Sequence, residues 1–534
     1  MILFFFYPLL SILILSFRPE GTWDFSGFIK LLSSPYYRDT FFYTCFQAFL
    51  STFFTILLAL PAAAVFVRFR FRGKNLLLSL ATLPFVLPTV VVATAFTALI
   101  GKNGVLNQFL MQTFSLEQAP IQIERSLLLI IIVHVFYNYA IALRMISSYW
   151  ARISSEIDEA ALILGCKGWR LWWYIRLPLL RPIIFAASIL VFIFTFTSFG
   201  IVLILGGIRF ATLEVQIYNQ AVNMLNLPLA AALSLIQISI MFILMLFYTK
   251  LQKQSQTTLR AENINQRNPR TKWEKIQVSG TVILISLFLF SPIVALLWRS
   301  VTAGMDGISF QHYINLFIND SNSVLFVPPI QAILNSLFFA ILAMILALLL
   351  GSIGAYMIHL LPSALLDPLF MLPLATSAVT LGFGFIIALG TPPLNLRSSW
   401  LIVVIAHTLV AIPFVVRSVL PAIRQIPHSV LEAGTVLGAA PLSRWRLIDL
   451  PLLGRSLLVG AIFAFTISMG EFGASLFVAR PDTPTIPLVI YRLLGRPGQT
   501  NYGQALAMSV ILMLICMLGF ILIERLRNVG VGEF

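Results

Sequence analysis

A few ionisable side chains within long apolar segments are the residues of this chain best placed to do chemistry. Glu471 puts a carboxylate into one such segment, and His134 and His407 each lie in another. A carboxylate in an apolar medium is costly unless it is paired or reaches water, so it often lines a pathway. Glu471 could therefore line a pathway or gate, or it could bind a hydroxyl or an arginine of a neighbouring helix. The two histidines could contact a cargo or carry protons, or they could be hydrogen-bonded core residues.

No catalytic or metal-binding pattern accompanies these residues. The three cysteines, Cys45, Cys166 and Cys516, and the five histidines lack the spacing of a metal site or a disulfide framework. The sequence also lacks the G-x-x-x-x-G-K-[ST] loop that cradles nucleotide phosphates, so the chain is not itself an ATPase. We expect no cofactor in this chain, and no enzymatic activity.

Two charged loops repeat each other at an offset of 273 residues. Each contains Glu-Ala followed by Ala or Gly, then a glycine four residues further on, and later Ile-x-Leu-Pro: Glu159, Ala160, Ala161 and Gly165 in the first loop, and Glu432, Ala433, Gly434 and Gly438 in the second. The same offset relates His134 to His407 and Ser198 to Glu471, and matching residues continue over roughly 75 positions. The chain therefore consists of two copies of one unit, which differ at the position of Glu471. Ser198, its counterpart in the first copy, is the second candidate for a pathway or gate residue.

Each loop is predicted to contain a short helix that ends in a left-handed turn. Acidic residues after Ser155 favour the positive end of a helix dipole, and Gly165 is placed to end that helix with a positive φ. In the second loop Ser429, one place later than the counterpart of Ser155, and Gly438 are expected to do the same. A short helix fixed between two membrane helices is a rigid peg, and two pegs on one side suit a two-lobed soluble partner.

The elements that position these loops are membrane spans. Hydrophobic residues make up 59% of the 534 residues and charged residues 10%, against about 25% charged in soluble proteins. The sequence predicts an all-α polytopic membrane protein of about 12 transmembrane helices. The predicted spans lie near 1–17, 41–67, 75–100, 127–147, 183–206 and 229–249, and then near 276–298, 331–358, 367–391, 400–423, 456–480 and 503–524.

These spans divide the chain into two six-helix units in the same orientation, as in a parallel repeat. The first unit covers 1–249, with its charged loop at about 148–182, and the second covers 276–534, with its loop at about 421–455. The polar and basic segment 250–275 has no hydrophobic period, so we predict a flexible connector on the inner face that could touch anionic lipid.

The net charge of +15 reports topology. With both termini inside, most Lys and Arg residues lie in the inner loops and tail, whereas acidic residues divide evenly, as the positive-inside rule expects. The charge thus gives no support for a nucleic-acid partner. The segment 1–17 has no basic start and no small-residue cleavage site, so we predict an uncleaved first helix. Its abrupt start leaves open whether residues precede Met1.

The repeated pattern E-A-A-x-x-x-G-x9-I-x-L-P resembles the motif of bacterial binding-protein-dependent ABC importer permeases of type I. The first loop matches it fully, and the second departs only at Gly434, which is expected to loosen that helix slightly. The resemblance covers nearly the whole chain. It implies that the eight loop residues given above dock into cytoplasmic ATP-binding-cassette subunits, one for each loop, which use the ATP.

The resemblance also implies an extracytoplasmic solute-binding protein as partner, and a multi-pass location in the bacterial inner membrane. Fusion of two units resembles the subgroup for ferric iron and thiamine, as do the segments around Phe199-Gly200 and Phe472-Gly473. The cargo stays open among ferric iron, thiamine, sulfate-like anions and phosphonates. An ion-coupled secondary transporter is the alternative, but it would leave the doubled loops unexplained. A membrane enzyme would need a polar catalytic cluster that the sequence does not contain.

Overall fold

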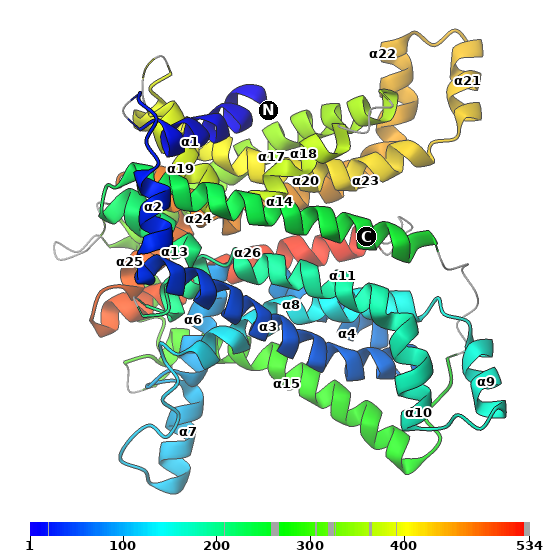
Figure 1. Ribbon diagram of the computed structural model, residues 1–534. Coiled ribbons are helices and arrows are strands. Elements are labelled where there is room, and N and C mark those ends of the chain that lie inside the picture. The colour runs from blue at the N-terminus through cyan, green and yellow to red at the C-terminus, as the bar shows by residue number, and fades with distance from the viewer. Residues whose placement is uncertain are drawn as a thin grey trace.

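The computed structural model describes residues 1–19, 21–207, 209–257, 266–304, 307–318, 325, 327–361, 366–390, 392 and 394–527, and long helices make up most of them. The long helices lie side by side and run between two ends of the molecule (Figure 1). The short helices α9 and α21 project from one end, and α7 and α25 lie at the opposite end.

The first unit contains fourteen α-helices among the residues described. They are α1 (Tyr7–Phe17), α2 (Ser26–Ser33), α3 (Pro35–Arg68), α4 (Lys74–Ala81), α5 (Leu83–Val86), α6 (Thr89–Ile100), α7 (Val105–Phe114), α8 (Leu127–Trp150), α9 (Ser155–Ile163), α10 (Trp169–Leu171), α11 (Leu177–Phe196), α12 (Gly200–Leu205), α13 (Leu213–Tyr218) and α14 (Leu227–Thr257). Single π-helical turns cover Ile2–Phe6, Trp172–Arg176 and Asn219–Asn223.

The second unit repeats this order with fewer small helices. They are α15 (Lys272–Thr302), α16 (Gln311–Ile314), α17 (Pro329–Leu360), α18 (Leu366–Ala375), α19 (Ala378–Leu389), α20 (Leu401–Gln425), α21 (His428–Val436), α22 (Pro441–Arg444), α23 (Leu450–Gly470), α24 (Gly473–Val478), α25 (Ile486–Leu494) and α26 (Gln499–Arg527). A π-helical turn covers Trp445–Asp449, and 3₁₀ turns cover Asn315–Phe317 and Leu396–Ser398.

The predicted helical membrane fold is confirmed, and ten helices within the described ranges are long and apolar enough to cross a bilayer. An eleventh is added if the bent pair α18 and α19 counts as one span. The remaining predicted span, 1–17, is the shorter apolar helix Leu3–Phe17, which begins part-way along the bundle (Figure 1). Its fifteen residues are too few to cross the full hydrocarbon core.

Two predicted spans are broken into shorter helices: 75–100 into α4, α5 and α6, and 367–391 into α18 and α19. In the first unit α5 ends before Leu87, whose extended backbone precedes Pro88, and α6 begins at Thr89. Proline disfavours helical geometry in the residue before it and lacks an N–H to continue the hydrogen bonding. In the second unit α18 and α19 meet at a bend of 88°, and the Ser377 hydroxyl caps α19 by accepting from Val379 N at 3.1 Å.

The predictions of unbroken helices over 183–206 and 456–480 are also wrong. The chain leaves helical hydrogen bonding between α11 and α12, and again between α23 and α24. Irregular backbone at this depth needs partners for its polar groups. Glu471 supplies one, because its Oε1 accepts a hydrogen bond from Ala474 N at 2.7 Å. Hydropathy could not reveal either break, because the residues that follow stay apolar.

The first helix of each unit packs against the other unit. Helix α1 lies against α19 of the second unit, and α15 lies against α6 and α3 of the first (Figure 1). The two units are therefore interlocked around a shared interface. The larger hydrophobic core contains residues of both units.

The connector 250–275 is more ordered than predicted where the structure describes it. Its first residues extend α14 to Thr257, and its last residues begin α15, which a capping box of Thr271 and Glu274 starts. Just before α15, Arg267 pairs by backbone hydrogen bonds with the segment that follows α3: Arg70 N donates to Arg267 O at 3.0 Å. The middle of the connector, 258–265, lies outside the described residues.

Candidate functional site

The two repeated loops lie at the same end of the bundle, where α9 and α21 stand out from the membrane helices (Figure 1). Both helices have nine residues. The sequence-predicted start is confirmed for α9, whose first turn carries Glu156 and Asp158, and whose cap Ser154 accepts from Glu156 N at 3.2 Å. Helix α21 differs, because Pro427 precedes it and its first turn has no acidic residue.

The glycine caps predicted from the sequence are confirmed in both loops. Gly165 has φ +82° and Gly438 has φ +80°. In the first loop Cys166 N donates to Ala161 O at 2.9 Å, and Gly165 N donates to Leu162 O at 3.1 Å. The second loop repeats both bonds at 3.0 Å. This is the Schellman arrangement, which requires a left-handed residue at the position that glycine occupies.

The residues of the shared motif divide between an outer and an inner face of each short helix. Glu159, Ala160, Glu432 and Ala433 are exposed, whereas Ala161 and Gly434 are buried. A Cβ atom at Gly434 would lie 2.6 Å from Cδ1 of Ile448, the isoleucine of the motif in the second loop. Glycine at this place therefore makes room for Ile448, which gives a packing reason for the one departure from the motif.

Both short helices end in exposed hydrophobic side chains that the sequence reading did not single out. Ile163 and Leu164 are each 86% exposed, and their counterparts Val436 and Leu437 are 87% and 85% exposed. These four residues, which we term the apolar tips, point away from the bundle core at equivalent places of the two loops. Their repetition at the offset of 273 was available as a signal in the sequence. Exposed apolar groups that recur at equivalent places in both units are candidates for a contact surface.

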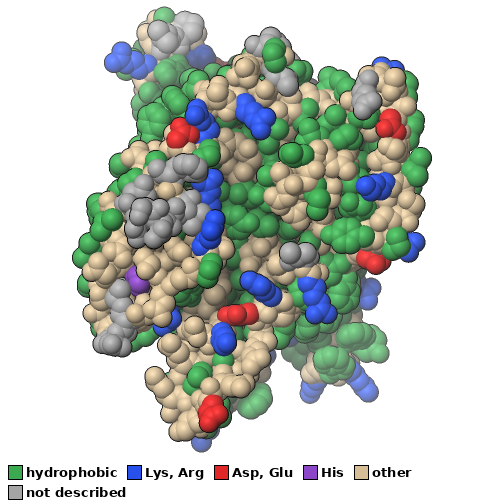
Figure 2. Space-filling model, turned by 90° about the vertical axis from the view of Figure 1, so that its left-hand side faces the viewer, with side chains coloured by type: hydrophobic (Ala, Val, Ile, Leu, Met, Phe, Trp, Pro, Cys, Tyr) green, Lys and Arg blue, Asp and Glu red, His purple; other side chains and the backbone are tan. Residues whose placement is uncertain are grey.

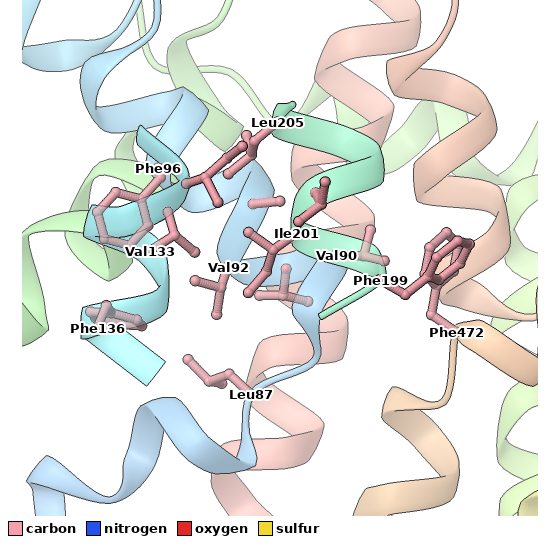
Figure 3. Close-up of a cluster of buried hydrophobic side chains, with 14 of the residues drawn as sticks. Leu87, Val90, Val92, Phe96, Val133, Phe136, Phe199, Ile201, Leu205 and Phe472 are labelled. Carbon is pink, nitrogen blue, oxygen red and sulfur yellow. The ribbon is translucent and has the colours of Figure 1, made fainter. Parts of the chain in front are cut away.

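At the centre of the bundle, equivalent residues of the two units meet. The rings of Phe199 and Phe472 stack with centroids 5.7 Å apart and planes inclined by 26° (Figure 3). Each ring also meets a tyrosine in an edge contact: Phe199 meets Tyr218 at 5.7 Å, and Phe472 meets Tyr491 at 5.4 Å. The stacked rings are themselves related by the offset of 273, and the same offset relates the two edge contacts to each other. The stacked pair therefore lies on the pseudo-twofold axis.

A cavity of about 290 Å³ borders this stacked pair, and it brings together the two predicted pathway residues. Ser198 and Glu471 both line it, with Phe199 and Phe472, and with Ser377 from the bend before α19. The Glu471 side chain is largely buried, at 9% exposure, and is held by the start of α24. Among the described lining residues, Glu471 carries the one carboxylate.

The two histidines are buried and hydrogen-bonded, as the core alternative expects. His134 Nε2 lies 2.8 Å from Ser198 Oγ, and its Nδ1 lies 3.2 Å from Ser51 Oγ. His407 bonds two hydroxyls in the same manner, Ser468 at 2.7 Å and Ser475 at 2.8 Å. His134 also lines the cavity, so it positions Ser198 there.

Glu214 is a polar residue of this region that sequence reasoning missed. Its side chain is fully buried in α13, where Gln237 Nε2 donates to Oε1 and Ser377 Oγ donates to Oε2 at 2.7 Å. The second bond links the first unit to the bend of the second unit. The segment lies between the predicted spans 183–206 and 229–249, so the sequence prediction left it outside the membrane helices. Ile217-Tyr218 at its end recurs as Ile490-Tyr491 at the offset of 273, and this repeat was a sign of packing, since Ile217 is buried.

Comparison with known families gives one match that covers most of the chain. The model of the family described as "binding-protein-dependent transport system inner membrane component" matches residues 46–256 and again 347–528. Each match contains one of the two repeated loops.

Several curated proteins are similar over almost the whole length. The thiamine transport system permease protein ThiP of Escherichia coli is 28% identical over 503 residues, 91% of this chain and 89% of that protein. ThiP of Haemophilus influenzae is 27% identical over 487 residues, 90% and 87% of the two chains. The ferric transport system permease protein FbpB of Actinobacillus pleuropneumoniae is 24% identical over 537 residues, 97% of this chain and 75% of that one.

Proposed function

Because the chain belongs to the family of binding-protein-dependent transport inner membrane components, we propose that its two units together form the whole translocation path for thiamine or ferric iron. It is a non-enzymatic, multi-pass permease of the inner membrane, and separate subunits hydrolyse the ATP. The observation that carries the proposal is the stacking of Phe199 on Phe472, because equivalent residues of the two units face each other within one chain.

The two loops are the docking elements for two ATPase subunits, one on each loop. Four features support this: the fixed glycine caps, the exposed faces with Glu159 and Glu432, the apolar tips, and the shared direction of α9 and α21. Residues Glu159, Ala160, Gly165 and their counterparts Glu432, Ala433 and Gly438 form or shape the contact surface. Ala161 and Gly434 contribute by letting the short helix pack closely on its own base.

This assignment sets the orientation of the chain. The end with α9 and α21 faces the cytoplasm, and both termini belong to that side. The opposite end faces the binding protein, and there Lys and Arg side chains surround a hollow in which hydrophobic side chains are visible (Figure 2). A solute released at this end would meet the central cavity after passing the short helices α13 and α25.

The central cavity and the stacked rings are the gate of the closed path. Glu471 and Ser198 lie at equivalent positions beside the axis, so each side offers the solute a different polar group. The aromatic stack closes the path between the units, and the breaks beside it give the backbone freedom to move there. Opening requires Phe199 and Phe472 to separate.

Reconstitution tests this function directly. The permease is placed in vesicles with its ATPase, and binding protein loaded with labelled thiamine or ferric iron is added on the outer side. We expect uptake of one of the two solutes that needs ATP inside the vesicle. Uptake driven by an ion gradient without ATP would support the secondary-transporter alternative. If neither solute is taken up while ATPase activity still responds to the binding protein, thiamine and ferric iron are refuted as solutes. The function as an ATP-driven importer would then still stand.

A further inference from the structure

A second cavity, of about 500 Å³, lies in the first unit at the end from which α9 and its docking loop project. It takes no part in the proposed path. Its walls come from the ends of α3 and α8, the starts of α11 and α15, and the base of α9. Arg267, from the segment before α15, completes the wall. Three arginines line the cavity, Arg68, Arg176 and Arg267, together with Trp150 and one acidic residue, Asp158.

Backbone pairing holds two of these arginines together. Arg267 N donates to Arg68 O at 3.3 Å, beside the bond from Arg70 N to Arg267 O. The intervening Phe69 is buried, and both guanidinium groups lie over its ring, with Cζ 5.3 Å from the centroid for Arg68 and 5.6 Å for Arg267. Stacking on an aromatic ring fixes the plane of a guanidinium and leaves its edge donors available. Two cations are thus held side by side on a rigid support.

The nearby carboxylates do not use up these donors. Asp158 is engaged by Arg176, whose Nη2 lies 2.7 Å from Oδ2. Glu274 accepts a hydrogen bond from Arg267 and forms a longer ion pair with Arg68. It also accepts hydrogen bonds from the backbone N–H groups of Arg270 and Thr271. It lies 3.7 Å from Arg68, beyond hydrogen-bonding distance. In the part of the chain that the structure describes, Arg68 makes no side-chain hydrogen bond, and its side chain is 50% exposed. The cavity therefore keeps an excess of positive charge.

The other part of the cavity wall is apolar. Pro61, Val65 and Leu179 line it, and they belong to helices that cross the membrane. The side chain of Leu179 is partly exposed, at 36%. A ligand that fits both parts has an anionic group, bound by guanidinium edges, and an apolar portion. Basic pockets between membrane helices at the cytoplasmic surface commonly bind anionic lipid headgroups, and guanidinium is well matched to phosphate.

We propose that this cavity binds the phosphate of an anionic phospholipid, with Arg68 and Arg267 as its ligands and an acyl chain along the wall of Pro61 and Leu179. A soluble phosphate compound shares the headgroup chemistry, but it leaves the apolar wall without a function. The bound lipid joins α3, α15 and the base of α9, because Ser154 and Asp158 line the same cavity. Its effect is to stabilise the first coupling loop.

The site belongs to one unit only. The connector occurs once in the chain, so the segment that carries Arg267 cannot be repeated beside the second loop. Anionic lipid therefore acts on one of two otherwise equivalent docking loops.

Lipid retention by the full-length permease tests the proposal. The protein is purified in detergent, delipidated, and titrated with phosphatidylglycerol, with phosphatidylcholine, or with glycerol 3-phosphate as the headgroup alone. Bound lipid is counted by native mass spectrometry. The variant Arg68→Gln removes one ligand at a half-exposed position, so folding should be kept, and thermal melting checks this. Arg72→Gln removes the same charge from an exposed position nearby that does not line the cavity, and it is the matched control.

We expect one tightly held phosphatidylglycerol, with affinity weakened about tenfold by Arg68→Gln, as for one lost charge-assisted hydrogen bond. Arg72→Gln should bind like the unchanged protein. Equal retention of phosphatidylcholine, or equal losses in the two variants, would overturn the proposal, because either would show general attraction to membrane lipid. Binding of glycerol 3-phosphate as tight as that of the lipid would overturn it in favour of a soluble phosphate ligand.

Discussion

The glycine caps of the coupling loops offer the sharpest test of how the chain transmits ATP hydrolysis. Replacing Gly165 and Gly438 together by valine should uncouple hydrolysis from transport without unfolding the membrane domain. Both glycines have φ near +80°, and an added Cβ would meet no atom within 4 Å at either place. The penalty therefore comes from the backbone conformation itself and not from a clash with neighbours.

The size of this free-energy penalty follows from the left-handed backbone conformation. A non-glycine residue there costs roughly 1–2 kcal/mol, and a β-branched residue costs more. Since 1.4 kcal/mol is about a factor of ten, each valine should reduce the population of the intact cap by roughly tenfold or more. The apolar tip directly precedes the cap, so its direction changes when the cap is lost. Asparagine tolerates this conformation better and should give an intermediate result.

The assay compares solute transported per ATP hydrolysed in reconstituted vesicles, and ATPase retained on the purified permease. Gly280→Ala is the matched control, because a Cβ at Gly280 also meets open space, but its backbone is helical. That control should behave like the unchanged protein or be slightly more stable. Normal coupling and normal ATPase retention in the double valine variant would refute the docking role of these caps.

Three further predictions address the partner, the topology and the gate. Leu164→Asp with Leu437→Asp should abolish co-purification of the ATPase at unchanged melting temperature, since both side chains are over 80% exposed; retained ATPase would exclude the apolar tips from the interface. A cysteine in 250–275 should resist an impermeant thiol reagent added outside, whereas one in 101–125 should react, and reversed labelling would overturn the orientation. Glu471→Gln should alter uptake or basal ATPase rate at unchanged stability, because the amide still accepts from Ala474 N, whereas Glu471→Ala loses the cap at about 0.5–2 kcal/mol. Wild-type uptake by Glu471→Gln would remove it from the path.

The local structure of the loops could be predicted because it depends on neighbouring residues. Acidic residues at the start of α9, the glycine at its end, and Pro178 in the first turn of α11 act over one or two helical turns. Repetition at a fixed offset then separated these signals from chance. The length of the apolar runs located the membrane segments, since each predicted span corresponds to one apolar helix or to a series of shorter helices.

The central site could not be predicted in the same way, because long-range packing creates it. Helices α11 and α23 end at Phe196 and Gly470, yet most residues on both sides are apolar, so the hydropathy profile does not show where they end. Nor could the sequence reveal that Glu214 is buried against Ser377, since 163 positions separate the two residues. The pairing of Phe199 with Phe472 was visible as a repeat, but their contact follows only from the position of the axis.

Fusion of the two units changes what can be placed next to that axis. In a dimer of identical chains, a carboxylate at the position of Glu471 would occur twice around the stacked rings, and two like charges that share one cavity repel each other. One of the two would then have to take up a proton or move away. A fused chain avoids this, because the first unit has Ser198 at the equivalent position, and Glu471 is the one carboxylate among the described residues that line the cavity. Glu214 follows the same logic, since its counterpart in the second unit is Pro487, so the inter-unit bond to Ser377 forms on one side only.

The symmetric features, the caps and apolar tips, are those that would contact two like ATPase subunits. The asymmetric features lie where one solute at a time would have to pass.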